Sequence, residues 1–247
     1  MLFMSIYCYV PAISVYTAII SFTIYLLNLR GLTPTILQES VYNVYMPRKI
    51  IPLITGEVYH VFNRGVDKRE IFHDKTDYIR FYQSMYLFNT VEPILNYSHA
   101  LTLVIDDPKD RLVRVHAFSL LPNHYHLLIE QLSEGGISEF VKRVSGGFTS
   151  YFNEKYDRSG ALFQGRFKRV HVTTDEQYKY VFAYVNENHI VHMTQRPDDI
   201  CYSSSSYFQG HHQSKLIDLK TSYNVEKSQE LAKDIYQRRQ REKSIIE

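Results

Sequence analysis

Two histidines that flank a single tyrosine are the residues of this chain best suited to chemistry. His124-Tyr125-His126 lies in an apolar stretch, from Val115 to Glu130, whose pattern is typical of a β-strand. Because strand side chains alternate between faces, the two histidines point to one side, about 7 Å apart along the strand, and Tyr125 points to the other. Two neutral imidazoles on one rigid face are half of a divalent-metal site. The alternative is that both simply line a wet face of a sheet.

A tyrosine in the middle of an expected helix is the second candidate. Tyr184 and Asn188 are four residues apart, so on one helix they would share a face. A tyrosine hydroxyl beside a divalent cation could attack a phosphodiester, with the Asn188 amide oxygen as a further ligand. Imidazole and oxygen ligands together favour Mg²⁺ or Mn²⁺ over a thiolate-binding metal. The alternative is that Tyr184 belongs to the packed stripe of an amphipathic helix.

The elements that would position these residues follow one another in an informative order. Hydrophobic periodicity and cap residues predict a strand at 57–63, a helix at 74–89, strands at 111–120 and 124–131, a helix at 138–155, an extended pair within 161–172 and a helix at 176–189. This is the split βαβ order of a ferredoxin-like α+β sandwich with an antiparallel sheet. We expect one face of that sheet to be free for a site.

Charge and aromatic content bear on the partner. The net charge of +2 is too small to identify a nucleic-acid binder, but from Ser138 to Val172 seven basic side chains face three acidic ones, a local balance of 7 − 3 = +4. Such a basic stripe is the expected footprint of phosphate contact. The 21 Tyr and 14 Phe suit stacking on unpaired bases, and they equally suit a well-packed core.

The two ends of the chain differ from its middle. Residues 1–28 carry no charged side chain, and about 20 apolar residues suffice to cross a bilayer. Residues 1–45 therefore form an apolar extension, either a genuine membrane or packing helix or upstream sequence ahead of a start at Met46. We assign residues 46–210 to the main domain and residues 211–247 to a charged tail whose helix, 227–247, is expected to face solvent. Residues 203–206 are expected to form a loop.

Cysteine usage points to a reducing compartment. Cys8 and Cys201 are the only cysteines, far apart and without metal-type spacing. We expect a cytoplasmic, nucleoid-associated protein, with membrane anchoring only if residues 1–45 are genuinely translated.

Five motifs occur in a fixed order along the chain. They are Tyr59-His-Val-Phe-Asn-Arg-Gly65, Phe118-Ser-Leu-Leu-Pro-Asn-His-Tyr-His-Leu-Leu-Ile129, Tyr151-Phe-Asn-Glu-Lys-Tyr156, Gly160-Ala-Leu-Phe-Gln-Gly-Arg-Phe-Lys168 and Tyr184-Val-Asn-Glu-Asn188. Each motif alone is weak, but their ordered coincidence is specific. Together, over about residues 56–208, they resemble the single-tyrosine HUH transposases, particularly the REP-associated tyrosine transposases.

This resemblance implies a ferredoxin-like domain that cuts and rejoins single-stranded DNA near small hairpins. Under it, His124 and His126 match the metal-binding pair, and Asn188 matches the position that completes metal coordination. Tyr184 matches the nucleophile, which takes the 5′ phosphate as a phosphotyrosine. The implied cofactor is a divalent metal, Mg²⁺ or Mn²⁺. No nucleotide cofactor is needed, because the phosphotyrosine retains most of the free energy of the phosphodiester, and a homodimer is compatible with the resemblance.

Basic and aromatic residues downstream of the histidine pair are expected to contact DNA. They are Lys142, Arg143, Arg158, Arg166, Phe167, Lys168 and Arg169. The chain departs from the family pattern after Asn188, where relatives commonly have proline and this chain has His189. Without that proline the tyrosine helix is free to run on towards His192.

The sequence therefore favours a metal-dependent single-stranded DNA strand transferase. The alternative on the same scaffold is a catalytically silent protein that binds hairpin DNA. A metal-dependent hydrolase of small molecules ranks third, because no further acid or base stands out beside the two histidines.

Overall fold

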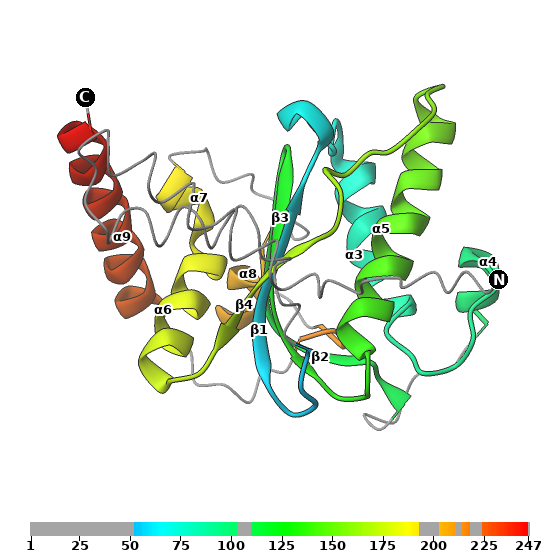
Figure 1. Cartoon of the computed structure of the whole chain (residues 1–247), viewed down its shortest axis with the longest axis horizontal. Helices are drawn as coiled ribbons and strands as arrows, with labels where there is room; N and C mark the ends of the chain where they lie inside the picture. The colour runs from blue at the N-terminus through cyan, green and yellow to red at the C-terminus, as the bar shows by residue number, and fades with distance from the viewer. Residues whose placement is uncertain (1–51, 103–109, 193–202, 211–213, 218–223, 247) are drawn as a thin grey trace, which may run out of the picture. The chain divides into compact units, whose positions relative to one another are not determined.

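The computed structural model describes residues 52–102, 110–192, 203–210, 214–217 and 224–246 (Figure 1). The predicted N-terminal extension 1–45, Cys8 and Cys201 lie outside these residues. None of the helices in the described segments is long and apolar enough to cross a membrane.

Four strands form one antiparallel sheet. They are β1 (Val58–Arg64), β2 (Val113–Leu121), β3 (His124–Gln131) and β4 (Lys168–Val172), and their order across the sheet is β2-β3-β1-β4. In this order β1 and β3 are central and each split βαβ unit encloses one of them. The ferredoxin-like prediction is confirmed, and β3 has the predicted bounds.

The helices join and follow these strands. They are the 3₁₀ turn η1 (Val66–Lys68), α3 (Lys75–Leu87), α4 (Tyr97–Ala100), α5 (Gly136–Lys155), α6 (Asp175–Asn186), α7 (Asn188–His192), α8 (Ser205–Phe208) and α9 (Val225–Ile246). Asp74 caps α3 in a reciprocal capping box with Asp77, and Thr174 caps α6 by accepting from the Gln177 amide. These caps satisfy amide groups that have no partner within the helix, which explains why both helices begin there.

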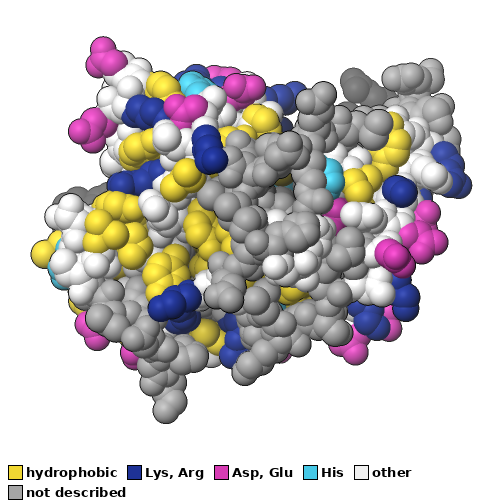
Figure 2. Space-filling model, turned by 180° about the vertical axis from the view of Figure 1, so that it is seen from behind, with side chains coloured by type: hydrophobic (Ala, Val, Ile, Leu, Met, Phe, Trp, Pro, Cys, Tyr) yellow, Lys and Arg dark blue, Asp and Glu magenta, His cyan; other side chains and the backbone are white. Residues whose placement is uncertain are grey.

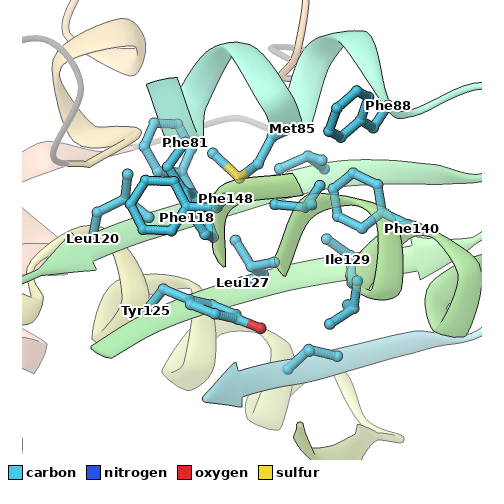
Figure 3. Close-up of a cluster of buried hydrophobic side chains, with 14 of the residues drawn as sticks. Phe81, Met85, Phe88, Phe118, Leu120, Tyr125, Leu127, Ile129, Phe140 and Phe148 are labelled. Atoms are coloured by element: carbon cyan, nitrogen blue, oxygen red, sulfur yellow. The ribbon is translucent and has the colours of Figure 1, made fainter. Parts of the chain in front are cut away.

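One face of the sheet packs against α3 and α5 around an aromatic core (Figure 3). Tyr125 and Leu127 of β3 point into this core, where they meet Phe81 of α3 and Phe148 of α5. Each of these side chains is at most 1% exposed. Burying a large apolar side chain contributes about 1.5–3 kcal/mol, so this layer holds the strands in register.

The opposite face of the sheet is covered by α6, and α9 packs in turn against α6 and α7. A second hydrophobic cluster fills this side of the sheet. It includes Leu128 of β3, Val185 of α6, and Ala232 and Ile235 of α9. Ala232 and Ile235 are 0% and 1% exposed. The expectation of a solvent-facing C-terminal helix is therefore wrong along this stripe, and the sheet face expected to be free is covered by α6.

The tyrosine helix is interrupted where a continuous helix was predicted. Helix α6 ends at Asn186, Glu187 follows with φ −104° and ψ 29°, and α7 begins at Asn188. The Asn186 side chain donates to the Phe182 carbonyl, a local bond that competes with regular helix hydrogen bonding. Residues 203–206, predicted to form a loop, include the start of α8. The chain is helical as far as His192, but in two segments.

Candidate active site

The two histidines of β3 lie side by side on the face covered by α6. Their ring centroids are 5.0 Å apart and their planes are inclined by 82°. Tyr125 between them points to the other face and is 1% exposed. The predicted alternation of the His-Tyr-His motif is therefore confirmed. His126 is 6% exposed, while His124 at the strand end is partly exposed and its Nδ1 lies 2.6 Å from Asn123 Oδ1.

Tyr184 meets this histidine pair from α6. Its ring centroid is 5.3 Å from that of His126, with the planes nearly perpendicular at 85°. The tyrosine is 8% exposed. The packing of α6 on β2 and β3 brings together two residues that are far apart in the sequence. Tyr184 therefore lies against His126 of the histidine pair, as the expected chemistry requires.

A third histidine, which the sequence analysis did not select, completes the group. His60 of β1 places its Nε2 atom 2.8 Å from His126 Nδ1. Its ring centroid is 5.8 Å from that of Tyr184. Burial lowers the pKa of His60 to about 4, so the ring is neutral at physiological pH. Strand alternation already places His60 and Phe62 on one face, but only the β1–β3 register brings them to His126, with Phe62 directly opposite it.

Two residues of this region carry buried polar atoms. Asn188 follows the interruption between α6 and α7, and Ser119 lies beside His126. Both amide atoms of Asn188 and the Ser119 hydroxyl lack a hydrogen-bond partner within the described part of the chain. Asn188 is 1% exposed and Ser119 is 3% exposed. Ser119 is the cross-strand partner of His126 in the β2–β3 ladder, so both side chains point to the same face. Buried polar groups normally have partners, so these atoms are suited to a bound ligand.

The chemical types of these side chains fit the ligands of a divalent cation. Two imidazoles with an amide oxygen form a mixed nitrogen and oxygen set that suits Mg²⁺ or Mn²⁺. No group of three or more His, Cys, Asp or Glu side chains that could hold a metal occurs among the described residues. A cation would therefore depend on the amide of Asn188 besides the imidazoles of His124 and His126. Tyr184 lies on α6 and Asn188 on α7, so the single continuous helix expected to carry both is wrong.

The residues expected to contact DNA are divided between the two faces of the sheet. Lys168 pairs with Phe62 across the β1–β4 ladder, which places Lys168 on the face of His60 and His126. Arg169 pairs with Val61 and so belongs to the opposite face. Lys168 is exposed at the sheet edge, so it is a cation that the structure puts on the same face as the histidine pair.

The other expected DNA contacts lie elsewhere or serve the fold. Lys142 and Arg143 are on α5, which packs on the face opposite His126. Arg143 bonds to Glu139 and to the carbonyls of Thr90 and Glu92.

Three further candidates precede β4. Arg158 donates to the Asn153 side chain and to the Ala161 carbonyl. Phe167 packs against the α3/α5 core, and Arg166 beside it is exposed. The basic stripe of the sequence is therefore not one patch, and Figure 2 shows a face on which basic and acidic side chains are interspersed.

Comparison with known proteins finds a family model that matches part of this chain. Residues 97–188 match the family model described as "Transposase IS200 like". The expected resemblance to transposases is confirmed over this stretch, the IS200-like region. It contains His124, His126, Tyr184 and Asn188, whereas His60 precedes it. No curated protein matches the chain in sequence.

A solved structure also resembles the chain. It is described as a REP-associated tyrosine transposase bound to a REP hairpin. The two chains are 15% identical, with a TM-score of 0.46, and the likeness covers 73% of this chain and 93% of the other.

Proposed function

We propose that this protein is a metal-dependent single-stranded DNA strand transferase that acts near DNA hairpins through a 5′-phosphotyrosine on Tyr184. The observation that carries the proposal is the approach of the Tyr184 ring to within 5.3 Å of the His126 ring, centroid to centroid. Both residues belong to the IS200-like region. A nucleophile, a pair of imidazoles and a buried amide are thus contributed by one matched segment.

The chemistry assigns one role to each group. The Tyr184 phenol oxygen attacks the phosphorus of a phosphodiester and forms a new P–O bond. The bond to the 3′ oxygen breaks, the phenol loses its proton and the 3′ oxygen gains one. The products are a 5′-phosphotyrosine and a free 3′ hydroxyl. Attack by a 3′ hydroxyl reverses the step and rejoins DNA without ATP, because one phosphodiester is exchanged for another.

A free phenol, with a pKa near 10, is a weak nucleophile at neutral pH. Packing of α6 on the sheet counters this by fixing the ring beside the histidines, and orientation of this kind can supply about 7 kcal/mol or more. His124, His126 and Asn188 would hold a divalent cation, which when bound polarises the phosphodiester and offsets developing negative charge. Lys168 on the same face is positioned to contact the DNA backbone.

The proposal is tested by covalent capture. Full-length protein is incubated with labelled single-stranded hairpin DNA and Mn²⁺, and the products are separated on a denaturing gel. We expect a protein–DNA adduct with the wild type and none with Tyr184→Phe, which keeps the ring and loses only the nucleophilic oxygen. Tyr180→Phe is the matched control, since Tyr180 lies on the same helix and is 40% exposed.

The alternative outcomes are distinct. Adduct formation by Tyr184→Phe at the wild-type level removes the proposal. Tight hairpin binding with no adduct from the wild type, with or without Mn²⁺, identifies a catalytically silent hairpin-binding protein instead.

A further inference from the structure

The hydrogen bond between two imidazoles is the most unusual contact of the site. His60 Nε2 and His126 Nδ1 are 2.8 Å apart, and the ring planes are inclined by only 23°. The ring centroids are 5.0 Å apart, farther than the two nitrogens, so the rings meet edge to edge. An edge-to-edge approach directs an N–H of one ring at the in-plane lone pair of the other.

Such a contact between neutral rings allows two arrangements of the protons. A neutral imidazole carries one N–H donor and one acceptor nitrogen. If His126 donates from Nδ1, its Nε2 keeps a lone pair and can bind a cation. If His60 donates from Nε2, the proton of His126 moves to Nε2 and blocks that atom. The direction of this hydrogen bond therefore decides whether His126 can serve as a ligand through Nε2.

We propose that His60 is a positioning residue that accepts a hydrogen bond from His126 Nδ1 and so presents His126 Nε2 to a divalent cation. This inference rests on the proposed function and assigns a role to a residue outside the IS200-like region. Histidines that bind metal generally donate their second ring N–H to a fixed acceptor, which orients the ring and increases its basicity. Here the acceptor is an imidazole held on the neighbouring strand.

The surroundings of His60 hold its ring beside His126. Its ring contacts Phe62 at a centroid distance of 5.0 Å and Tyr184 at 5.8 Å. Its partner on β4 is Val170 and its partner on β3 is Leu128. Aromatic and aliphatic neighbours restrain the ring, so the Nε2 atom stays directed at His126.

The first test measures the tautomer of His126 directly. The full chain is labelled with ¹⁵N, and the ring nitrogens are observed by two-bond ¹H–¹⁵N NMR in the absence of metal. We expect the proton of His126 on Nδ1 and the lone pair on Nε2. A proton on Nε2 overturns the inference, and it does so without bearing on whether Tyr184 forms an adduct.

The second test measures Mn²⁺ binding by electron paramagnetic resonance. His60→Phe keeps a ring of similar size and removes the acceptor, so we expect the Kd for Mn²⁺ to rise about 10–100-fold, the range found when such supporting partners are removed. His60→Gln supplies an amide oxygen close to the position of Nε2 and should restore most of the affinity. His171→Phe is the matched control, because His171 lies on the same sheet and bonds to Glu57 on the other face.

The outcomes separate the inference from the proposed function. Equal Mn²⁺ affinity of His60→Phe and wild type overturns the positioning role, and so does equal loss in the phenylalanine and glutamine variants. Loss of one coordinated imidazole in the His60→Phe spectrum would show that His60 is itself a ligand and would also overturn it. If His60→Phe does not fold, the tautomer measurement decides. Covalent capture with Tyr184→Phe tests the strand-transfer proposal independently of all these results.

Discussion

Ser205 of α8 donates a hydrogen bond of 2.8 Å to the carboxylate of Glu187, the residue that follows the end of α6. Beside it, Ser204 donates to the Asn186 side chain at 2.5 Å. Glu187, Ser204 and Ser205 are each 0% exposed. A segment about 18 residues downstream therefore holds the break that follows Tyr184, and with it the start of α7.

Removing the Ser205 hydroxyl should destabilise the interruption between α6 and α7. Ser205→Ala deletes a hydrogen bond to a buried carboxylate, a change that costs about 1–3 kcal/mol of unfolding free energy. We expect a loss in that range by urea unfolding followed by circular dichroism, together with slower adduct formation, because Asn188 begins α7. Ser206→Ala removes only a 3.4 Å contact to the Ser203 carbonyl and serves as the control. Equal effects of the two variants would contradict a specific role for the Ser205 bond.

The break itself shows where the sequence ceases to be informative. Tyr178, Val181, Phe182 and Val185 form a helical stripe, and local periodicity predicts the helix correctly up to that point. The bond from the Asn186 side chain to the Phe182 carbonyl is local, but Ser204 and Ser205 reach Asn186 and Glu187 only in the folded chain. Periodicity alone therefore does not mark Asn186 as the end of the helix. The C-terminal helix illustrates the same limit, because its few apolar residues, such as Ile235, are buried by partners that periodicity does not specify.

The histidine site could be predicted only in part, because only some of its geometry is a local property of the sequence. Alternation along one strand is a local property, so the common face of His124 and His126 followed from spacing alone. Their approach to Tyr184 followed from the resemblance to a family and not from spacing. His60 could be placed on a strand face, but its contact with His126 depends on the register of β1 against β3. Register is set by the whole buried face, which one strand does not reveal.

Lys155 forms an ion pair with a buried carboxylate where α5 packs on α3. Its Nζ atom lies 2.7 Å from an oxygen of Asp77 and 2.7 Å from one of Asp74. The Asp77 side chain is fully buried. Lys155→Met leaves this carboxylate without its cation, although Tyr156 still donates to it at 2.8 Å. Because that bond remains and the Lys155 ammonium is partly exposed, we expect the unfolding free energy to fall by about 1–3 kcal/mol, the range for a buried group that loses one hydrogen-bond partner.

Urea unfolding of Lys155→Met against the wild type measures this loss. Lys142→Met is the matched control, since Lys142 is 78% exposed and pairs with Glu139 at 3.3 Å on the helix surface. We expect the control to change the unfolding free energy by no more than about 0.5 kcal/mol. Equal losses of unfolding free energy in both variants would show that the burial of Asp77 does not determine the size of the loss.

The same cluster predicts how stability depends on pH. Burial raises the pKa of Asp77, but hydrogen bonds from Lys155, the His73 amide and Tyr156 outweigh burial and hold this pKa below its ordinary value. Hydrogen bonds from Lys155 and Thr76 lower the pKa of Asp74 further. Carboxyl groups in an unfolded chain titrate near pH 3.9. The stabilisation is therefore complete above about pH 4 and is lost as the pH falls towards the lowered folded pKa values.

Unfolding free energies measured between pH 2 and pH 7, about the range over which carboxyl groups titrate, should show this loss. In Lys155→Met the Asp77 carboxylate is no longer held ionised by a cation. We therefore expect the difference between wild type and variant to be largest near neutral pH and to shrink below about pH 4. A difference that stays constant down to the acid limit would mean that the ion pair contributes through packing alone.

DNA binding should distinguish the two faces of the sheet. Lys168 is exposed on the face of His126, while Lys142 is exposed on α5 at the opposite face. Single-stranded DNA that reaches Tyr184 must contact the first face. Lys168→Ala should therefore weaken binding and reduce the slope of log K against log salt by about 0.7, the value for one phosphate of a single strand. Lys142→Ala should leave the slope unchanged, and the reverse order in a salt titration would place the DNA on the α5 face.

Two adjacent glycines in α5 should respond to alanine in opposite directions. A Cβ atom at Gly147 would lie 2.7 Å from the ring of Phe88, which is 5% exposed and held in the α3/α5 core. A Cβ atom at Gly146 would meet nothing within 4 Å. Neither glycine has a positive φ, so backbone strain does not enter. Gly146→Ala should stabilise the protein by about 0.5–1 kcal/mol through helix propensity.

Gly147→Ala gains the same propensity but forces the Phe88 ring to shift in a close-packed layer. Overpacking of this kind costs about 1–3 kcal/mol, which equals or exceeds the gain. We therefore expect thermal unfolding to show a higher Tm for Gly146→Ala and a lower Tm for Gly147→Ala. The comparison isolates packing, because the two variants add the same methyl group to neighbouring positions of one helix. A rise in both would mean that Phe88 moves at no cost and that the α3–α5 contact is looser than its geometry indicates.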